Sequence, residues 1–203
     1  MQYPPVKFYF MEQARAIFLF SSLCFAFFSL NAQVLPVRTA FQSGLANVVE
    51  YYPNQFKNLA GEVLTENPQS TDYRSVVTLK GAEECIITKF SAKGKEIYSW
   101  HAVMLTTEDF EEAVKKYKSL YNSIQRLAVK VIGTNAVLSS EFVDPVEEKK
   151  FNSIIFTVSD TDENLKKLKV ELTLQNDLLE WVIKVLVYEK EREDDERGEI
   201  IDQ

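Results

Sequence analysis

The sequence predicts an α+β protein in which a mainly antiparallel sheet of about six strands is covered by one long amphipathic helix, with a short helix before it. Apolar residues recur every three or four positions from Thr107 to about Val131, which is the period of a helix that buries one face. Shorter segments on both sides of that helix are rich in β-branched and aromatic residues, as strands are. Because short connections join consecutive strands, we expect mainly antiparallel pairing, and one sheet with one principal helix is an α+β arrangement.

The first part of the folded body is expected to be helical and then looped. Residues 33–44 show no clear period, whereas Leu45–Tyr52 has the composition of a short helix that ends at Pro53. A further helical turn is expected at Gln55–Ala60. The segment Thr65–Asp72 is rich in turn-forming residues and is predicted to be a surface loop.

Three strands are predicted before the long helix, at Tyr73–Leu79, Glu84–Ser91 and Glu96–Leu105. The last two flank Ala92-Lys93-Gly94-Lys95 and are expected to form a hairpin. Alternation along the third strand puts Trp100 on one face of the sheet and His101 on the other. Both residues have apolar neighbours on their own face, so we expect both faces to be largely covered.

The long helix has an apolar stripe and a charged face. The stripe comprises Phe110, Ala113, Val114, Tyr117, Leu120, Tyr121, Ile124, Leu127 and Ala128. Thr106 or Thr107 is expected to cap the free amides of the first turn. Acidic residues lie near the N-terminal end and basic residues follow, as the helix dipole favours. We expect the stripe to cover the sheet; the alternative is that it binds a partner.

Three further strands are predicted after a less regular region in which Val137–Val143 is an additional short strand. They lie at 151–158, 168–174 and 181–188. The strand at 168–174 alternates apolar and polar residues, which is typical of a sheet with one face in water. The strand at 181–188 is apolar on both faces except for Lys184 and is expected to be central. Gln175-Asn176-Asp177 is expected to form the turn between them.

The N-terminal residues have the pattern of a cleavable signal peptide. Lys7 and Arg15 precede an uncharged, mostly apolar run from Ala16 to Leu30. That run is shorter than the roughly 20 apolar residues of a membrane-spanning helix, and its length suits a signal peptide. Cleavage is expected after Ala32.

Export would divide the chain into three parts: a signal peptide at residues 1–32, a single α+β domain at residues 33–188 and a charged tail at residues 189–203. We expect translation to begin at Met1 or Met11. The mature protein is then expected to be periplasmic or secreted, with only transient contact to the membrane through its signal peptide. The alternative is an uncleaved N-terminal anchor.

Composition and charge narrow the classes of function. The chain is 46% hydrophobic and 12% aromatic, which is typical of a globular protein and not of a disordered one. Its formal net charge is −7, and residues 189–203 hold much of the acidic excess. Lysine and arginine do not cluster as a nucleic-acid-binding surface requires, so we expect no nucleic-acid partner.

Candidate catalytic groups are few. His101 is the only histidine, and Cys85 is the only cysteine that follows the expected cleavage site. We therefore expect no metal site, no internal disulfide and no cofactor, and the six glycines form no phosphate-binding loop. The alternative is a thiol-dependent or hydrolase-like enzyme in which Cys85 and His101 meet across the predicted hairpin. The more ordinary interpretation is a buried thiol and a packed histidine.

Aromatic residues supply the candidate binding site. Tyr51, Tyr52 and Phe56 lie close together after the first predicted helix, and Tyr98 and Trp100 share one face of the third predicted strand. Such rings can line a pocket for an apolar group. The alternative is that they are buried as packing edges of the core.

The short apolar signal that ends in Asn31-Ala32-Gln33 and the order of strands and helix resemble small exported proteins of unknown function from Gram-negative bacteria of the Bacteroidetes type. This resemblance implies export and carries over no catalytic motif. Because the catalytic set is missing, the sequence favours an exported, non-catalytic binding or accessory domain. Its partner would be a protein, a peptide or a lipid-like ligand, held on a sheet face or in a groove between helix and sheet.

Overall fold

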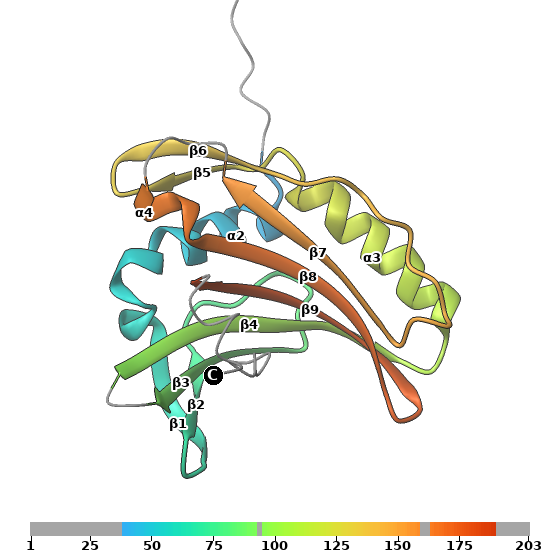
Figure 1. Cartoon of the computed structure of the whole chain (residues 1–203), viewed down its shortest axis with the longest axis horizontal. Coiled ribbons are helices and arrows are strands. Elements are labelled where there is room, and N and C mark those ends of the chain that lie inside the picture. The colour runs from blue at the N-terminus through green and yellow to red at the C-terminus, as the bar shows by residue number, and fades with distance from the viewer. Residues whose placement is uncertain (1–37, 93–94, 159–162, 190–203) are drawn as a thin grey trace, which may run out of the picture. The chain divides into compact units, whose positions relative to one another are not determined.

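The computed structural model describes residues 38–92, 95–158 and 163–189, and it confirms the α+β prediction. These residues form a nine-stranded antiparallel sheet with two longer helices (Figure 1). The expected signal peptide and nearly all of the expected charged tail lie outside the described residues. Within the described residues, no helix is long and apolar enough to cross a membrane.

The strand order is β1-β2-β3-β4-β9-β8-β7-β6-β5, so strands from the two halves of the chain meet where β4 pairs with β9. The strands are β1 (Ala60–Glu66), β2 (Ser70–Ser75), β3 (Glu84–Ala92), β4 (Lys95–Thr107), β5 (Ala128–Val131), β6 (Thr134–Ser139), β7 (Phe151–Val158), β8 (Leu168–Asp177) and β9 (Glu180–Glu189). Strand β9 is the fifth of the nine, which confirms the prediction that the segment at 181–188 is central.

The helices pack against the sheet at two places. Helix α2 (Ala40–Glu50) contacts β5, and helix α3 (Phe110–Ile124) contacts β4, β8 and β9. Two short 3-10 helices, η1 (Tyr52–Asn54) and η2 (Lys57–Leu59), link α2 to β1. A single helical turn, α4 (Glu163–Lys166), precedes β8.

Helix α2 begins earlier than the sequence pattern predicted. Thr39 caps it: the Thr39 hydroxyl accepts a hydrogen bond from the Gln42 amide, and the Gln42 side chain accepts one from the Thr39 amide. This is a capping box, in which two free backbone donors are satisfied reciprocally. The expected absence of regular structure throughout residues 33–44 was therefore wrong for its last residues, and the helix ends at Glu50, before Tyr51 and Pro53.

Helix α3 is shorter than predicted at both ends. Asp109, and neither Thr106 nor Thr107, provides the cap, because its carboxylate accepts hydrogen bonds from the amides of Glu111 and Glu112. The helix ends at Ile124, and residues 128–131 form strand β5. Val129 and Val131 face the core while Ala128 and Lys130 are exposed, so a period of two prevails there over the helical period.

Several strand boundaries also differ from the prediction. The expected loop at 65–72 is a hairpin, in which β1 pairs with β2, and β2 ends at Ser75 instead of continuing to Leu79. The expected strand at 137–143 lies earlier, as β6. The predicted hairpin of β3 and β4 is confirmed by pairing from Glu84↔Val103 to Ala92↔Lys95.

The turn between β8 and β9 was predicted three residues too early. Strand β8 continues to Asp177, which pairs with Glu180, so the tight turn consists of Leu178 and Leu179 alone. Leu178 has a φ of 61°, in the left-handed region that favours glycine. Both leucines are exposed, and Figure 1 shows the hairpin projecting at the lower right.

The core lies between the helices and one face of the sheet, which we call the inner face. A row of directly paired residues crosses the inner face, comprising Tyr73, Ile87, Trp100, Val187, Val170 and Phe156. Helix α3 contributes Ala113, Tyr117, Leu120 and Ile124, all buried. Cys85 is a free thiol and adds no disulfide to this packing, which stabilises the described domain.

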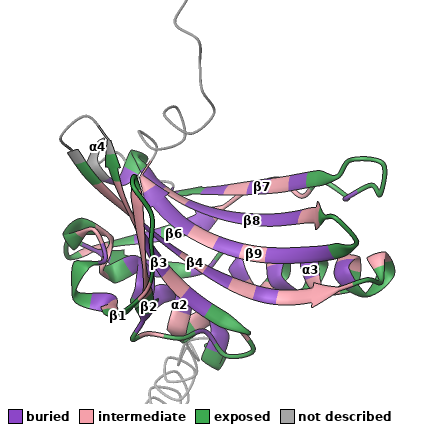
Figure 2. Ribbon diagram, turned by 90° about the horizontal axis from the view of Figure 1, so that it is seen from below, coloured by how far each residue is buried: buried purple, intermediate pink, exposed green. Residues whose placement is uncertain are grey.

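The other face of the same strands is called the open face, because the long helices do not cover it. Figure 2 shows β7, β8, β9 and β4 in front of α3, with this face toward the viewer. The row that crosses it from β2 to β7 comprises Arg74, Ile86, His101, Leu186, Glu171 and Ile155, each directly paired with the next.

Candidate functional site

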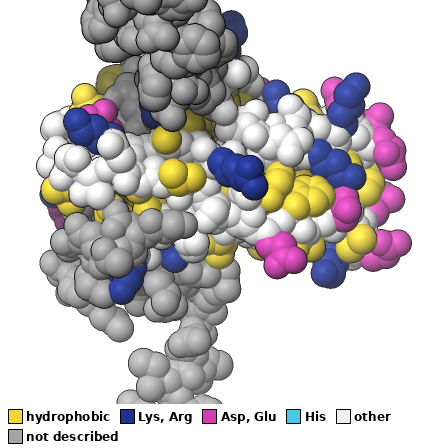
Figure 3. All heavy atoms as spheres, turned by 90° about the horizontal axis from the view of Figure 1, so that it is seen from above, with side chains coloured by type: hydrophobic (Ala, Val, Ile, Leu, Met, Phe, Trp, Pro, Cys, Tyr) yellow, Lys and Arg dark blue, Asp and Glu magenta, His cyan; other side chains and the backbone are white. Residues whose placement is uncertain are grey.

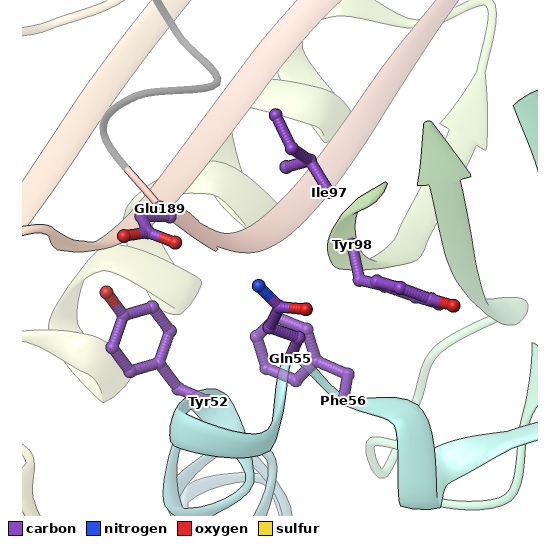
Figure 4. Close-up of a pocket in the computed structure, with 6 residues that line it drawn as sticks. All are labelled: Tyr52, Gln55, Phe56, Ile97, Tyr98 and Glu189. Atoms are coloured by element: carbon purple, nitrogen blue, oxygen red, sulfur yellow. The ribbon is translucent and has the colours of Figure 1, made fainter. Parts of the chain in front are cut away.

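Three of the five aromatic residues singled out in the sequence line one hollow. Tyr52 and Phe56 come from the 3-10 region after α2, and Tyr98 comes from β4; Gln55, Ile97 and Glu189 complete the lining (Figure 4). The rings of Tyr52 and Phe56 lie 6.4 Å apart between centroids. In Figure 4 the Tyr52 hydroxyl points toward the Glu189 carboxylate.

The hollow is too small for an organic ligand. Its free volume is about 10 Å³, which is roughly the space that one water molecule needs. Phe56 is only 1% exposed and belongs to the core. The aromatic residues therefore act mainly as packing at this end of the sheet.

The backbone beneath the hollow is locally strained. Gln55 and Phe56 have φ values of 52° and 54°, two consecutive residues in the left-handed region. Such residues persist only where surrounding packing holds them. Burial of the Phe56 ring against the core supplies that packing, so the strain is accounted for by the fold.

The other two aromatic candidates lie outside the hollow. Tyr51 follows α2 and packs, partly buried, against the core. Trp100 is fully buried, and its indole Nε1 donates a hydrogen bond to Ser75 Oγ at 2.9 Å. The five predicted residues therefore do not form one site: Tyr52, Phe56 and Tyr98 line the hollow, whereas Trp100 belongs to the core.

Tyr98 lies at the rim of the hollow beside charged groups. The Lys57 ammonium lies 5.2 Å from the centroid of the Tyr98 ring, and the Tyr98 hydroxyl donates a hydrogen bond to Glu96 at 3.4 Å. Burial, followed by the nearby Glu96 carboxylate, raises the pKa of the Tyr98 hydroxyl. The hydroxyl therefore stays protonated at neutral pH and serves as a donor.

The geometry does not bring Cys85 and His101 together. Cys85 pairs with Ala102, whereas His101 pairs with Ile86. Because adjacent residues in a strand point to opposite faces, the Cys85 thiol lies on the inner face and the His101 ring on the open face. Burial raises the pKa of the Cys85 thiol, which lowers the fraction of reactive thiolate.

The open face holds a group of polar side chains that the sequence analysis did not single out. Glu171, on β8, is buried, and the residues paired with it on the adjacent strands, Ile155 and Leu186, are apolar. Its carboxylate accepts a hydrogen bond from the Tyr188 hydroxyl at 2.9 Å and another from the Ser153 hydroxyl. A buried carboxylate is costly unless it is hydrogen-bonded, and these two donors provide the compensation.

The charge of Glu171 also acts through the sheet. Tyr117, on α3, lies against the inner face and donates a hydrogen bond to the Leu172 carbonyl at 3.3 Å. Burial, and secondarily the Glu171 charge, raises the pKa of Tyr117 well above its ordinary value. The Tyr117 hydroxyl is accordingly a fixed, neutral donor of the core.

Two further hydroxyls on the open face lack partners. Ser99 Oγ and Thr173 Oγ1 are the buried side-chain polar atoms, within the described residues, for which no hydrogen-bond partner is present. Ser99 pairs with Thr88, and Thr173 pairs with Lys184, so both belong to the open face. Buried polar groups in folded proteins are nearly always hydrogen-bonded, and each exception needs an explanation.

The alternation at 168–174 was the signal in the sequence for this face. It predicted that Lys169, Glu171 and Thr173 share one side that faces water. The three do share one side, but Glu171 and Thr173 are buried there, so the expected exposure to water was wrong for these two. Their association with Tyr188 and Ser153 depends on strand order and register, neither of which the alternation specifies.

We expect Tyr188→Phe to lower the free energy of unfolding by about 1.5–3 kcal/mol, because it removes a hydrogen bond to a buried carboxylate. Urea denaturation followed by far-ultraviolet circular dichroism measures the change. Tyr98→Phe is the matched control: it removes a hydroxyl whose bond to Glu96 is long and exposed, and we expect a change below about 0.5 kcal/mol. Equal losses in the two variants would contradict the role assigned to Glu171.

Metal-ligating groups and surface charge are the remaining features of the described residues. Within the part of the chain that the structure describes, no group of three or more histidine, cysteine, aspartate or glutamate side chains is placed to hold a metal ion. Figure 3 shows one surface of the molecule, on which basic, acidic and hydrophobic side chains are interspersed and acidic ones gather toward one end.

No protein-family model, no curated protein and no solved structure matches this chain.

Proposed function

We propose that this chain is an exported, non-catalytic binding domain that holds a protein or peptide partner on the open face of its sheet. The observation that carries the proposal is the composition of that face. It combines half-buried apolar side chains, such as Ile155 and Leu186, with half-buried charged ones, such as Lys169 and Lys184. Binding surfaces commonly combine apolar contact area with a few polar groups that fix orientation.

The shape of the face favours an extended partner over a small ligand. The open face crosses six strands, from Arg74 on β2 to Ile155 on β7. A surface of that width suits a protein or peptide, which contacts many side chains at once. The aromatic hollow, with its volume of about 10 Å³, does not support a small-molecule or acyl-chain function.

The absence of a joined catalytic pair also supports binding over catalysis. A nucleophilic cysteine needs its base within hydrogen-bond reach. The Cys85 thiol and the His101 ring point to opposite faces of the sheet, so the alternative thiol-dependent mechanism has no geometric support.

Site-specific photo-crosslinking tests this proposal. A photoreactive residue replaces Leu186 at the centre of the open face, in cells that make the protein, and the product is recovered from the periplasm or the medium. We expect one discrete adduct of protein or peptide mass. The matched control places the same photoreactive residue at Lys130, an exposed position on β5, where we expect no adduct.

Four results would count against the proposal. Adducts of the same mass from both positions would indicate non-specific contact, and no adduct from position 186 would indicate an unoccupied face. An adduct of lipid mass would replace the protein partner with a lipid. Recovery of the product only from the cytoplasm would contradict export.

A further inference from the structure

The turn between β8 and β9 breaks the local rules for a hairpin. We call residues Asp177–Glu180 the leucine tip. Two-residue hairpin turns favour glycine, asparagine or aspartate, because a positive φ is needed at the first or at both positions. Here the turn residues are Leu178 and Leu179, with a φ of 61° at Leu178. Their side chains are 92% and 81% exposed.

The charges beside the two leucines add to the conflict. Asp177 and Glu180 are directly paired across the hairpin, and like charges in that position destabilise it. Neither residue forms an ion pair with another described residue. Positions where sequence and local structure disagree in this way are commonly functional or strained sites.

The same chain carries a surface with complementary properties. An open hollow of about 380 Å³ lies between β4 and α3, lined by Leu105, Glu112, Lys115, Lys116 and Ser119. We call it the α3 hollow. Leu105 provides an apolar contact, and the two lysines have no ion-pair partner among the described residues. Glu112 is already engaged, since it accepts a hydrogen bond from the Thr107 hydroxyl at 2.7 Å.

We propose that the leucine tip of one copy of this chain docks into the α3 hollow of a second copy. Leu178 and Leu179 would cover Leu105, while Asp177 and Glu180 would lie beside Lys115 and Lys116 of the other copy. The exposure of both leucines shows that the tip does not occupy the hollow of its own chain. This interface lies at the β8–β9 turn and does not depend on the proposed function.

Sedimentation velocity of the protein purified after expression of the full chain, over a range of concentrations, tests the proposal. We expect reversible, concentration-dependent association. The double variant Leu178→Gly/Leu179→Asn supplies residues that suit the turn and removes the apolar side chains. Its dissociation constant should rise at least roughly a hundredfold, because each leucine withdrawn from water contributes about a tenfold factor or more.

The control is Ile132→Asn, at the turn between β5 and β6. Ile132 is also an exposed apolar residue with a positive φ, and asparagine before Gly133 suits that turn. This variant should associate like the unchanged protein. Urea denaturation should show that neither variant is less stable, so loss of association in the tip variant does not reflect unfolding.

A charge exchange tests the pairing itself. Lys115→Glu/Lys116→Glu should weaken association, and adding Asp177→Lys/Glu180→Lys should restore it. The proposal is overturned if the unchanged protein stays monomeric at every concentration, if the tip variant associates normally, or if the exchange restores nothing. Tip-dependent flotation with phosphatidylethanolamine–phosphatidylglycerol vesicles, without self-association, would assign the tip to a membrane surface instead.

Discussion

Trp100→Ala is expected to lower the free energy of unfolding by about 3–5 kcal/mol. The indole is fully buried between the sheet and the helices, beside Ile87 and Val187 in the inner-face row. Its removal leaves a cavity that close-packed neighbours only partly fill. It also leaves Ser75 Oγ without the hydrogen bond that it accepts from the indole at 2.9 Å.

Equilibrium urea unfolding measures this loss, and Val76→Ala is the control. Val76 is 65% exposed, so its truncation should change the unfolding free energy by less than about 0.5 kcal/mol. Because domains of this kind are stable by only about 5–15 kcal/mol, Trp100→Ala removes a large part of the total. A loss below about 1 kcal/mol would show that Trp100 is accessible, as a binding residue would be.

Cys85 is expected to react with a thiol reagent at least roughly a thousandfold more slowly in the folded protein than in urea. The side chain is 4% exposed, so reaction requires opening of the structure, and the open fraction is about one in a thousand or less. Burial also raises the pKa of the thiol, chiefly by desolvation, and the neighbouring Glu84 carboxylate raises it further. Both effects keep the thiolate scarce near neutral pH.

Peptide-resolved mass spectrometry after timed labelling measures the rate at Cys85. Labelling should remain slow as the pH rises through 8.5, the ordinary pKa of a cysteine, because access to the buried sulfur limits the reaction. Rapid labelling of the folded protein would reverse the geometric argument and restore the thiol-dependent mechanism as a candidate. The same reagent applied to Trp100→Ala should label faster, because that variant opens more often.

The main elements of the fold could be predicted because their periodic patterns are strong. The apolar stripe of α3 predicts a helix that covers a sheet. The continuous apolar run of β9 predicts a central strand that is covered on both faces. The start of α2 was missed although its signal was readable, since Thr39 and Gln42 have the spacing of a capping box. The end of α3 was not, because Leu127 and Val129 fit a helical stripe and an alternating strand about equally well.

The leucine tip shows why the best local turn signal can fail. Gln175, Asn176 and Asp177 are better turn residues than two leucines. The observed register pairs Leu174 with Ile183 and places both on the inner face. Shifting a strand by one residue would turn its whole apolar set to the other face, so burial of the core overrides turn preference.

The candidate sites were harder to predict from the sequence than the fold class was, because they depend on contacts between distant segments. The grouping of Tyr52, Phe56 and Tyr98 was partly visible in the sequence, but the depth of the hollow was not. Whether Cys85 and His101 share a face of the sheet depends on the register of β3 against β4. The observed pair Cys85↔Ala102 separates them, and no local pattern specifies that register. The burial of Glu171 depended on Tyr188, a residue of the neighbouring strand.

By itself the sequence determined the α+β class, the central position of the strand at 181–188 and the polar side of the strand at 168–174, because these follow from periodicity and composition within one segment. Only the tertiary structure decided which faces meet, which residues share a hollow and where the β8–β9 turn lies. The physical reason is that strand register and order are set by burial summed over the whole sheet, and no single segment contains that sum.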